Sequence, residues 1–206
     1  AEEKLKTTLV EKENLMQELN HRVKNNLYII SSLIHLKDTA LGEQADLEDI
    51  KHQVDAIQIV HNKLTYTADY KNINIHDYLQ DLVRTFFASY SSLRVDLNID
   101  IENIELPTKK AVPLGLITNE IATNAVKHGF IEGAPAWFST ALSTDHENQQ
   151  YVYTSANSGN PFPDDIDFDT TTTLGMRLIK GLLTQIDATI ELQRKPSPLF
   201  TIRFPV

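Results

Sequence analysis

The stretch ELNHRVKNNLY, residues 18–28, decides the fold because it lies in the middle of a long helical pattern. Apolar residues recur on both sides of it at alternating spacings of four and three. This spacing is typical of a helix that buries one narrow stripe against another helix. It predicts one helix over 1–37, and a similar stripe from Leu47 to Leu64 predicts an antiparallel partner helix. The first stripe consists of Leu5, Leu9, Met16, Leu19, Val23, Ile30 and Leu33, with Lys12, Asn26 and Lys37 at the remaining positions.

A helical hairpin of this kind has little core of its own. Two copies would complete a four-helix bundle, so we expect a homodimer through residues 1–69. His21 lies between Leu19 and Val23 and therefore points away from the buried stripe, with Asn25 on the same face. A lone His in such a place is usually a solvated surface residue, so a functional interpretation needs a second signal.

Composition excludes several classes of function. Apolar content of 41% and charged content of 23% are ordinary for a soluble globular protein. The net charge of −9 argues against a nucleic-acid partner, which would require a basic surface. The absence of cysteine rules out disulfides, thiolate catalysis and Cys-ligated zinc. No apolar run approaches the ~20 residues of a membrane-spanning helix.

From about residue 70 the pattern changes to mixed helices and strands. We expect an α+β fold, with a helical hairpin over 1–69 followed by a second domain over 70–206. The expected strands are 73–75, 94–101, 137–142, 151–155, 189–193 and 199–204, and the expected helices are 76–90, 108–128 and 174–186.

The second signal is TNEIATNAVKHGF, residues 118–130, within the long helix. Glu120, Asn124, Lys127 and His128 fall at i, i+4, i+7 and i+8, so α-helical spacing places them on one polar stripe opposite an apolar face. A carboxylate, an amide oxygen and a cation suit a hydrated Mg²⁺ and the phosphates that it bridges. The alternative is a solvated helix face.

Two glycine-containing segments follow. In NSGNPFP, residues 157–163, the glycine allows backbone to approach a planar ligand. Leu174 and Gly175 open a later helix, where a glycine at the N-terminus can receive phosphate. Each motif alone is weak, but their order and spacing together are informative.

The motif HRVKNN, residues 21–26, followed by NEIATNAVKHGF, residues 119–130, resembles a two-component sensor histidine kinase. The subfamily is the one whose phosphoacceptor motif reads His-Arg-x-x-Asn-Asn. The resemblance covers essentially the whole chain. It implies a dimerisation and phosphotransfer hairpin over 1–69. It also implies a two-layer α/β ATP-binding domain of the gyrase/heat-shock-90/kinase/mismatch-repair (GHKL) type over 70–206.

The resemblance also implies a site for ATP and Mg²⁺. His21 would be autophosphorylated, Asn124 would bind Mg²⁺, and Lys127 and His128 would contact phosphates. The other nucleotide-binding residues would be Asn157, Gly159 in the adenine pocket, Phe162, Leu174, and Gly175 in a phosphate loop beyond a lid at about 164–173.

Two positions depart from the family pattern. Asn157 replaces the usual Asp that accepts from the adenine amino group, and Pro161 replaces a second glycine. An Asn oxygen still accepts one hydrogen bond. Losing the charge-assisted bond costs about 1–2 kcal/mol, or about tenfold in affinity, so we expect weak nucleotide binding.

The resemblance leaves the general base open, because Arg22 follows His21 where many of these kinases carry an acidic residue. We rank Glu120 first and Glu18 second. The phosphoryl group would pass to an Asp of a response-regulator receiver domain. Asn25 would orient a water for dephosphorylation of that partner, or is a simple surface amide.

Two other functions remain open from the sequence. One is a catalytically impaired dimeric scaffold that docks a regulator without ATP turnover, and the other is an ATPase without transfer to His21. We further expect a cytoplasmic fragment whose sensor region, and any membrane attachment, lie upstream of this sequence.

Overall fold

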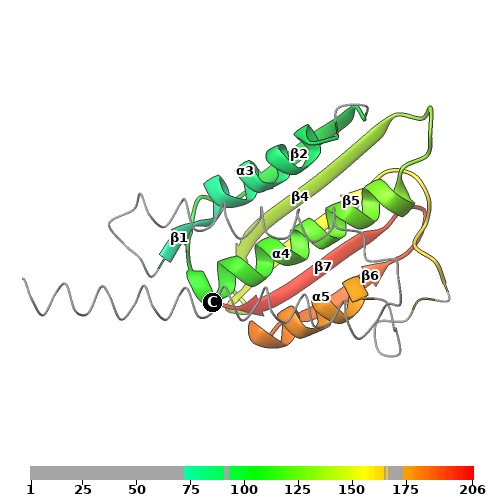
Figure 1. Ribbon diagram of the computed structural model, residues 1–206. Helices are drawn as coiled ribbons and strands as arrows, with labels where there is room; N and C mark the ends of the chain where they lie inside the picture. The colour runs from blue at the N-terminus through cyan, green and yellow to red at the C-terminus, as the bar shows by residue number, and fades with distance from the viewer. Residues whose placement is uncertain (1–71, 91–92, 165, 167–173) are drawn as a thin grey trace, which may run out of the picture. The chain divides into compact units, whose positions relative to one another are not determined.

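The computed structural model describes residues 72–90, 93–164, 166 and 174–206, which all belong to one compact unit (Figure 1). The expected hairpin, with His21, Asn25 and the boundary between 69 and 70, lies outside these residues and stays a prediction.

The described part of the chain is built on a five-stranded mixed sheet. The strand order is β2-β4-β5-β7-β6, so β2 and β6 are the two edges. The β2–β4 pair is parallel and the other pairs are antiparallel. The strands are β2 (Val95–Ile101), β4 (Ala136–Asp145), β5 (Gln150–Asn157), β6 (Thr189–Gln193) and β7 (Leu199–Pro205).

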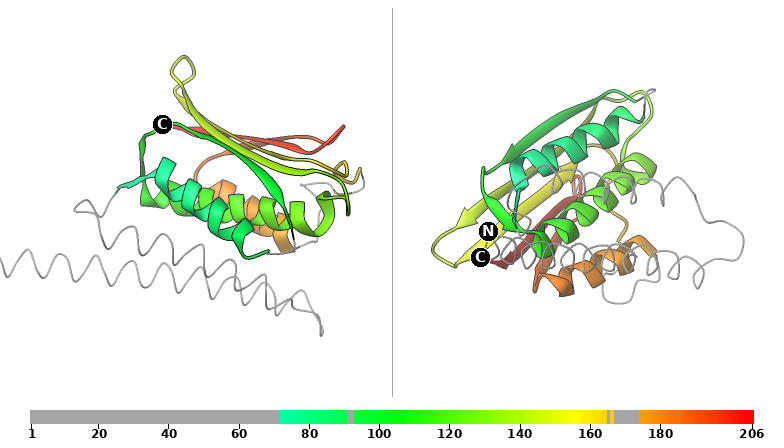
Figure 2. Two further views of the ribbon diagram at one scale, coloured as in Figure 1. Left: turned by 90° about the horizontal axis from the view of Figure 1, so that it is seen from above. Right: turned by 60° about the vertical axis from the view of Figure 1, so that its left-hand side comes forward.

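Three helices cover one face of this sheet and form the second layer (Figure 2, left). Buried side chains alternate along β7, as expected when one face of a sheet carries the core. The fold is thus a two-layer α+β domain, which confirms the fold class expected from the sequence. The helices are α3 (Ile75–Ala88), α4 (Thr108–Asn124) and α5 (Leu174–Gln185), and a small antiparallel pair joins β1 (Asn72–Asn74) to β3 (Glu105–Pro107).

Most of the expected elements are present, with shifted ends. Helix α3 begins at Ile75, which was expected to lie in the preceding strand. The reason is that the Asn74 side chain caps the helix by accepting from the backbone N–H of Asp77 at 3.0 Å. Strand β4 continues three residues beyond the expected Leu142, and β3 was not expected at all.

Helix α4 differs most from expectation, because it is buried on all sides. It lies between α3 and α5 and against the sheet (Figure 1), and every residue from Ala111 to Thr123 is buried. The expected division into an apolar and a polar face is therefore wrong. Asn119 is 3% exposed and Glu120 is 8% exposed, so a solvated helix face is excluded for them.

Thr118 connects this helix to the sheet. Its hydroxyl donates to the Leu114 carbonyl at 2.8 Å and accepts from the Tyr153 hydroxyl on β5 at 2.8 Å. Burial raises the pKa of Tyr153, so the phenol stays protonated and keeps donating. No helix in the described part of the chain is long and apolar enough to span a membrane.

Candidate functional site

The candidate site lies where the end of α4 meets the loop after β5 and the start of α5. Three glycines mark close contacts that leave no room for a side chain. A Cβ on Gly129 would lie 2.5 Å from Nδ2 of Asn157, and one on Gly159 would lie 2.1 Å from the carbonyl oxygen of Gly129. A Cβ on Gly175 would lie 2.0 Å from Oε1 of Glu120. Two expected residues, Glu120 and Gly175, thus meet directly, and two others, Asn157 and Gly159, both lie against Gly129.

Helix α4 passes directly into a π-helix, η1 (Ala125–Gly129). The backbone N–H of Phe130 donates to the Ala125 carbonyl at 2.9 Å, which closes the wide turn. Single π turns of this kind occur frequently at functional sites. The α-helical spacing behind the expected polar stripe holds only as far as Asn124. Lys127 and His128 lie on the wide turn and are exposed.

Asn160 connects the loop after β5 to this π-helix. Its backbone N–H donates to the Gly129 carbonyl at 2.7 Å, and its side-chain Nδ2 donates to the His128 carbonyl at 3.1 Å. Gly159 reaches this contact with a φ of +102°, which residues other than glycine rarely adopt. Asn160 is not among the site residues expected from the sequence, although an Asn beside a glycine is a common turn signal.

Asn124 is suited to a magnesium ion. Its side chain is partly buried, and its Nδ2 is a buried atom with no hydrogen-bond partner among the described residues. The described residues contain no cluster of three His, Cys, Asp or Glu that could hold a metal by itself. Mg²⁺ typically takes one or two protein oxygens and completes its shell with phosphates and water, so the amide oxygen of Asn124 fits this pattern.

Asn157 is 2% exposed, and its orientation is fixed by its neighbours. Its Nδ2 donates to the Ser158 carbonyl at 2.8 Å. Ser158 is held in turn by Trp137, whose carbonyl accepts from Ser158 N–H at 3.0 Å and whose N–H donates to Ser158 Oγ at 2.9 Å. Because the amide nitrogen is used in this way, the remaining branch of the side chain is an acceptor oxygen. An acceptor is what an adenine amino group requires.

We expect Asn157→Asp to lower the free energy of unfolding by about 1–3 kcal/mol at pH 7. A carboxylate cannot donate to the Ser158 carbonyl and would be buried against it. Lowering the pH protonates the new carboxyl and restores a donor, so the stability difference from the wild type shrinks as pH falls. Urea denaturation at pH 7 and pH 5 measures both effects. The control is Asn160→Asp, the same change at an exposed amide; an equal loss in the two variants would contradict the argument.

Phe162 packs into the edge of the core. Its ring is 8% exposed and meets Phe200 of β7 edge-on at 5.8 Å between centroids. The Arg194 guanidinium lies 5.4 Å from the centre of the ring. A nucleotide contact by Phe162 stays a prediction, as does one by Leu174, which begins α5 but whose side chain lies outside the described residues.

Comparison with known proteins finds similarity to histidine kinases. A family model described as "Histidine kinase" matches residues 18–90. The blue-light-activated histidine kinase 2 of Erythrobacter litoralis is 24% identical over 184 residues, which cover 87% of this chain and 53% of that relative. The chain therefore spans about half the length of this relative.

Solved structures agree on the fold. The histidine kinase domain of a blue-light activated histidine kinase from Erythrobacter litoralis superposes with a TM-score of 0.70 at 18% identity, covering 87% of this chain and 95% of that one. Histidine kinase ThkA in complex with response regulator protein TrrA gives a TM-score of 0.53 at 15% identity, covering 93% and 61%.

The described fold is shared with solved histidine kinase domains. Together with the family match, this supports a two-component sensor histidine kinase.

Proposed function

We propose that this chain is the catalytic core of a sensor histidine kinase, which autophosphorylates His21 from ATP and passes the phosphoryl group to a response-regulator aspartate. One observation carries the proposal. The chain that contains the HRVKNN motif also places Gly175 against Glu120 of α4, and Asn157 and Gly159 against Gly129 at the end of the π-helix. These residues are in the segments that the resemblance assigned to nucleotide binding.

The proposed reaction begins at His21. An imidazole of ordinary pKa, about 6.5, is mostly neutral near pH 7, and its free nitrogen attacks the γ-phosphorus of ATP. The N–P bond forms while the bond to the bridging oxygen breaks, and ADP leaves with that electron pair. The other ring nitrogen gives up its proton to a carboxylate. We assign that role to Glu120, with Glu18 as the alternative.

Phosphoryl transfer depends on positioning and on charge neutralisation more than on covalent help. Mg²⁺, when bound, supplies much of the positive charge. Asn124 offers it an amide oxygen, and Lys127 and His128 lie on the wide turn beside Asn124. The backbone N–H groups at the start of α5, next to Gly175, provide a place for phosphate oxygens.

The proposed partner is a response-regulator receiver domain that docks on residues 1–69, which would also form the homodimer. The complex of ThkA with its response regulator, a structural relative of this chain, supports the choice of partner. Asn25 would orient the water that dephosphorylates the regulator. A cytoplasmic location and an upstream sensor region belong to the same proposal, and the relative's greater length leaves room for such a region.

The test is incubation with γ-labelled ATP and Mg²⁺. We expect an acid-labile label on the wild type that is lost in His21→Gln and kept in His146→Gln, since His146 is an exposed histidine in the β4–β5 turn. No nucleotide binding would support the scaffold instead, and phosphate release without label would support an ATPase.

Comparing Glu120→Gln with Glu18→Gln identifies the general base. Only the loss of the general base should lower kcat strongly at unchanged nucleotide affinity.

A further inference from the structure

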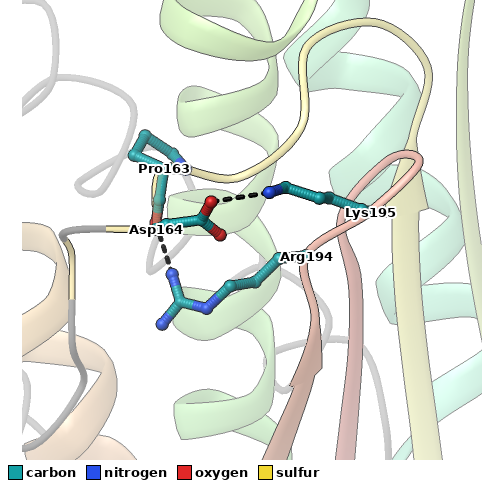
Figure 3. A network of polar contacts seen from close by, with 4 residues as sticks. All are labelled: Pro163, Asp164, Arg194 and Lys195. Atoms are coloured by element: carbon teal, nitrogen blue, oxygen red, sulfur yellow. Dashed lines mark hydrogen bonds and ion pairs between the residues drawn. The ribbon is translucent and has the colours of Figure 1, made fainter.

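Arg194 lies just after β6, in the turn of the last hairpin, and reaches the segment that follows the candidate site (Figure 3). One guanidinium nitrogen, Nη1, donates to the Pro163 carbonyl. The other, Nη2, donates to the Ile166 carbonyl at 2.7 Å. One side chain therefore binds two carbonyl groups of a segment about 30 residues away in sequence.

The same residue holds Phe162 in two further ways. The backbone N–H of Phe162 donates to the Arg194 carbonyl at 3.1 Å. The guanidinium also lies over the Phe162 ring in a cation–π arrangement. The Phe162 ring is buried and packs edge-on against Phe200. The guanidinium thus contacts both the backbone and the preceding aromatic ring of one short segment.

This segment continues directly from the candidate site. Residues 157–160 are fixed to the π-helix through Asn160, and Phe162, Pro163 and Ile166 are fixed to the hairpin through Arg194. The loop is thus tied at both ends. A loop that is already ordered loses less conformational entropy when a ligand binds to it.

We propose that Arg194 is a positioning residue for nucleotide binding, because it fixes Phe162, Pro163 and Ile166, which follow Asn157 and Gly159 in the chain. The proposal rests on the proposed function. The chemistry requires arginine. Its rigid planar fork spans the two carbonyls, whereas a lysine ammonium on a flexible stem is a point donor.

The neighbouring Lys195 provides a matched control. Its ammonium bonds the Asp164 carboxylate at 2.6 Å in the same network, and both side chains are about two-thirds exposed. Lys195, and to a smaller extent Arg194, holds the pKa of Asp164 below its usual value. An exposed ion pair of this kind contributes little to stability. Removing Lys195 thus deletes a nearby charge without touching the two carbonyl contacts.

The experiment titrates the full chain with a fluorescent ADP analogue in the presence of Mg²⁺. We expect Arg194→Met to raise Kd about tenfold, the equivalent of one charge-assisted hydrogen bond. Arg194→Lys should give an intermediate value, and Lys195→Met should stay within about twofold of the wild type. In His21 autophosphorylation, Arg194→Met should raise KM for ATP and leave kcat unchanged, whereas general misfolding would lower the active fraction. Should Arg194→Met fail to fold, Arg194→Lys decides the question.

Hydrogen exchange at the Phe162 and Asp164 amides separates this proposal from the proposed function. Faster exchange in Arg194→Met than in Lys195→Met supports the positioning role. If the wild type binds nucleotide and Arg194→Met binds it equally well, the positioning role is overturned. If the wild type binds none, the proposed function fails. The exchange rates then test only whether Arg194 orders the segment that it contacts. Equal rates in the two variants would overturn that role too.

Discussion

Gly159→Ala is expected to lower the free energy of unfolding by about 3 kcal/mol or more. Two costs add. The φ of +102° is strained for any residue with a side chain, and the new Cβ would lie 2.1 Å from a backbone oxygen, that of Gly129. That oxygen already accepts from Asn160 N–H at 2.7 Å, so it cannot move without breaking this bond. In thermal unfolding the loss corresponds to a fall in Tm of about 6–12 °C for a chain of this size.

Two other glycines of the described residues serve as controls. Gly133 has a φ of +77°, but a Cβ added there would meet nothing within 4 Å, so Gly133→Ala should cost only the backbone strain, about 1–2 kcal/mol. Gly181 is inside α5 with open space around it, so Gly181→Ala should stabilise by about 0.5–1 kcal/mol. If Gly159→Ala lowers the free energy of unfolding no more than Gly133→Ala does, Gly159 does not make the close contact with the π-helix.

Gly115→Ala is expected to destabilise by about 2–3 kcal/mol, because it overfills the contact between α4 and α3. The added Cβ would lie 1.9 Å from Oη of Tyr78 and 2.5 Å from its Cζ. Both Gly115 and the Tyr78 ring are buried, so neither can swing into solvent. Relief therefore requires a shift of the two helices relative to each other. Urea denaturation measures the loss.

Tyr78→Phe tests the same contact from the other side. The Tyr78 hydroxyl is buried without a hydrogen-bond partner among the described residues, and burial raises the pKa of the phenol, so the group is never ionised at neutral pH. Removing such a hydroxyl should be neutral or slightly stabilising. In the double variant it should also recover part of the Gly115→Ala loss, since the nearest atom is gone. Purely additive effects would contradict the contact.

Elements with a local pattern were predictable from the sequence. The alternation from Val95 to Ile101 indicated β2, and the last hairpin needed almost no correction. Strand β3 was missed because its three residues hold one buried apolar side chain, Leu106, next to Pro107, and show no alternation. The sheet order, with its crossover between β2 and β4, depends on long-range packing that no local pattern contains.

Helix α4 was misread because its polar residues are buried for specific reasons. The hydroxyls of Thr118 and Thr123 bond to carbonyls of their own helix, which allows them to be buried. Asn119 also lies in the interior, although a polar residue type is usually expected at the surface. The π turn after Asn124 was not expected, because the sequence pattern there is that of a continuous α-helix.

The site was only half predictable. The motifs indicated Asn157, Gly159 and Gly175, and the glycine contacts explain why two of these positions lack a side chain. Asn160 and Arg194 were missed because their partners are backbone carbonyls, which leave no trace in residue identity. Such contacts become visible only when distant segments are placed side by side.

The exposed edge of the sheet has a consequence for self-association. Strand β2 leaves one row of backbone groups without a neighbouring strand in the described domain, and such edges invite pairing with a second molecule. Its exposed positions are Asp96, Asn98 and Asp100. Two copies joined through this edge would bring carboxylates close together, which is unfavourable. We therefore expect the acidic edge to disfavour aggregation through β2 at high concentration.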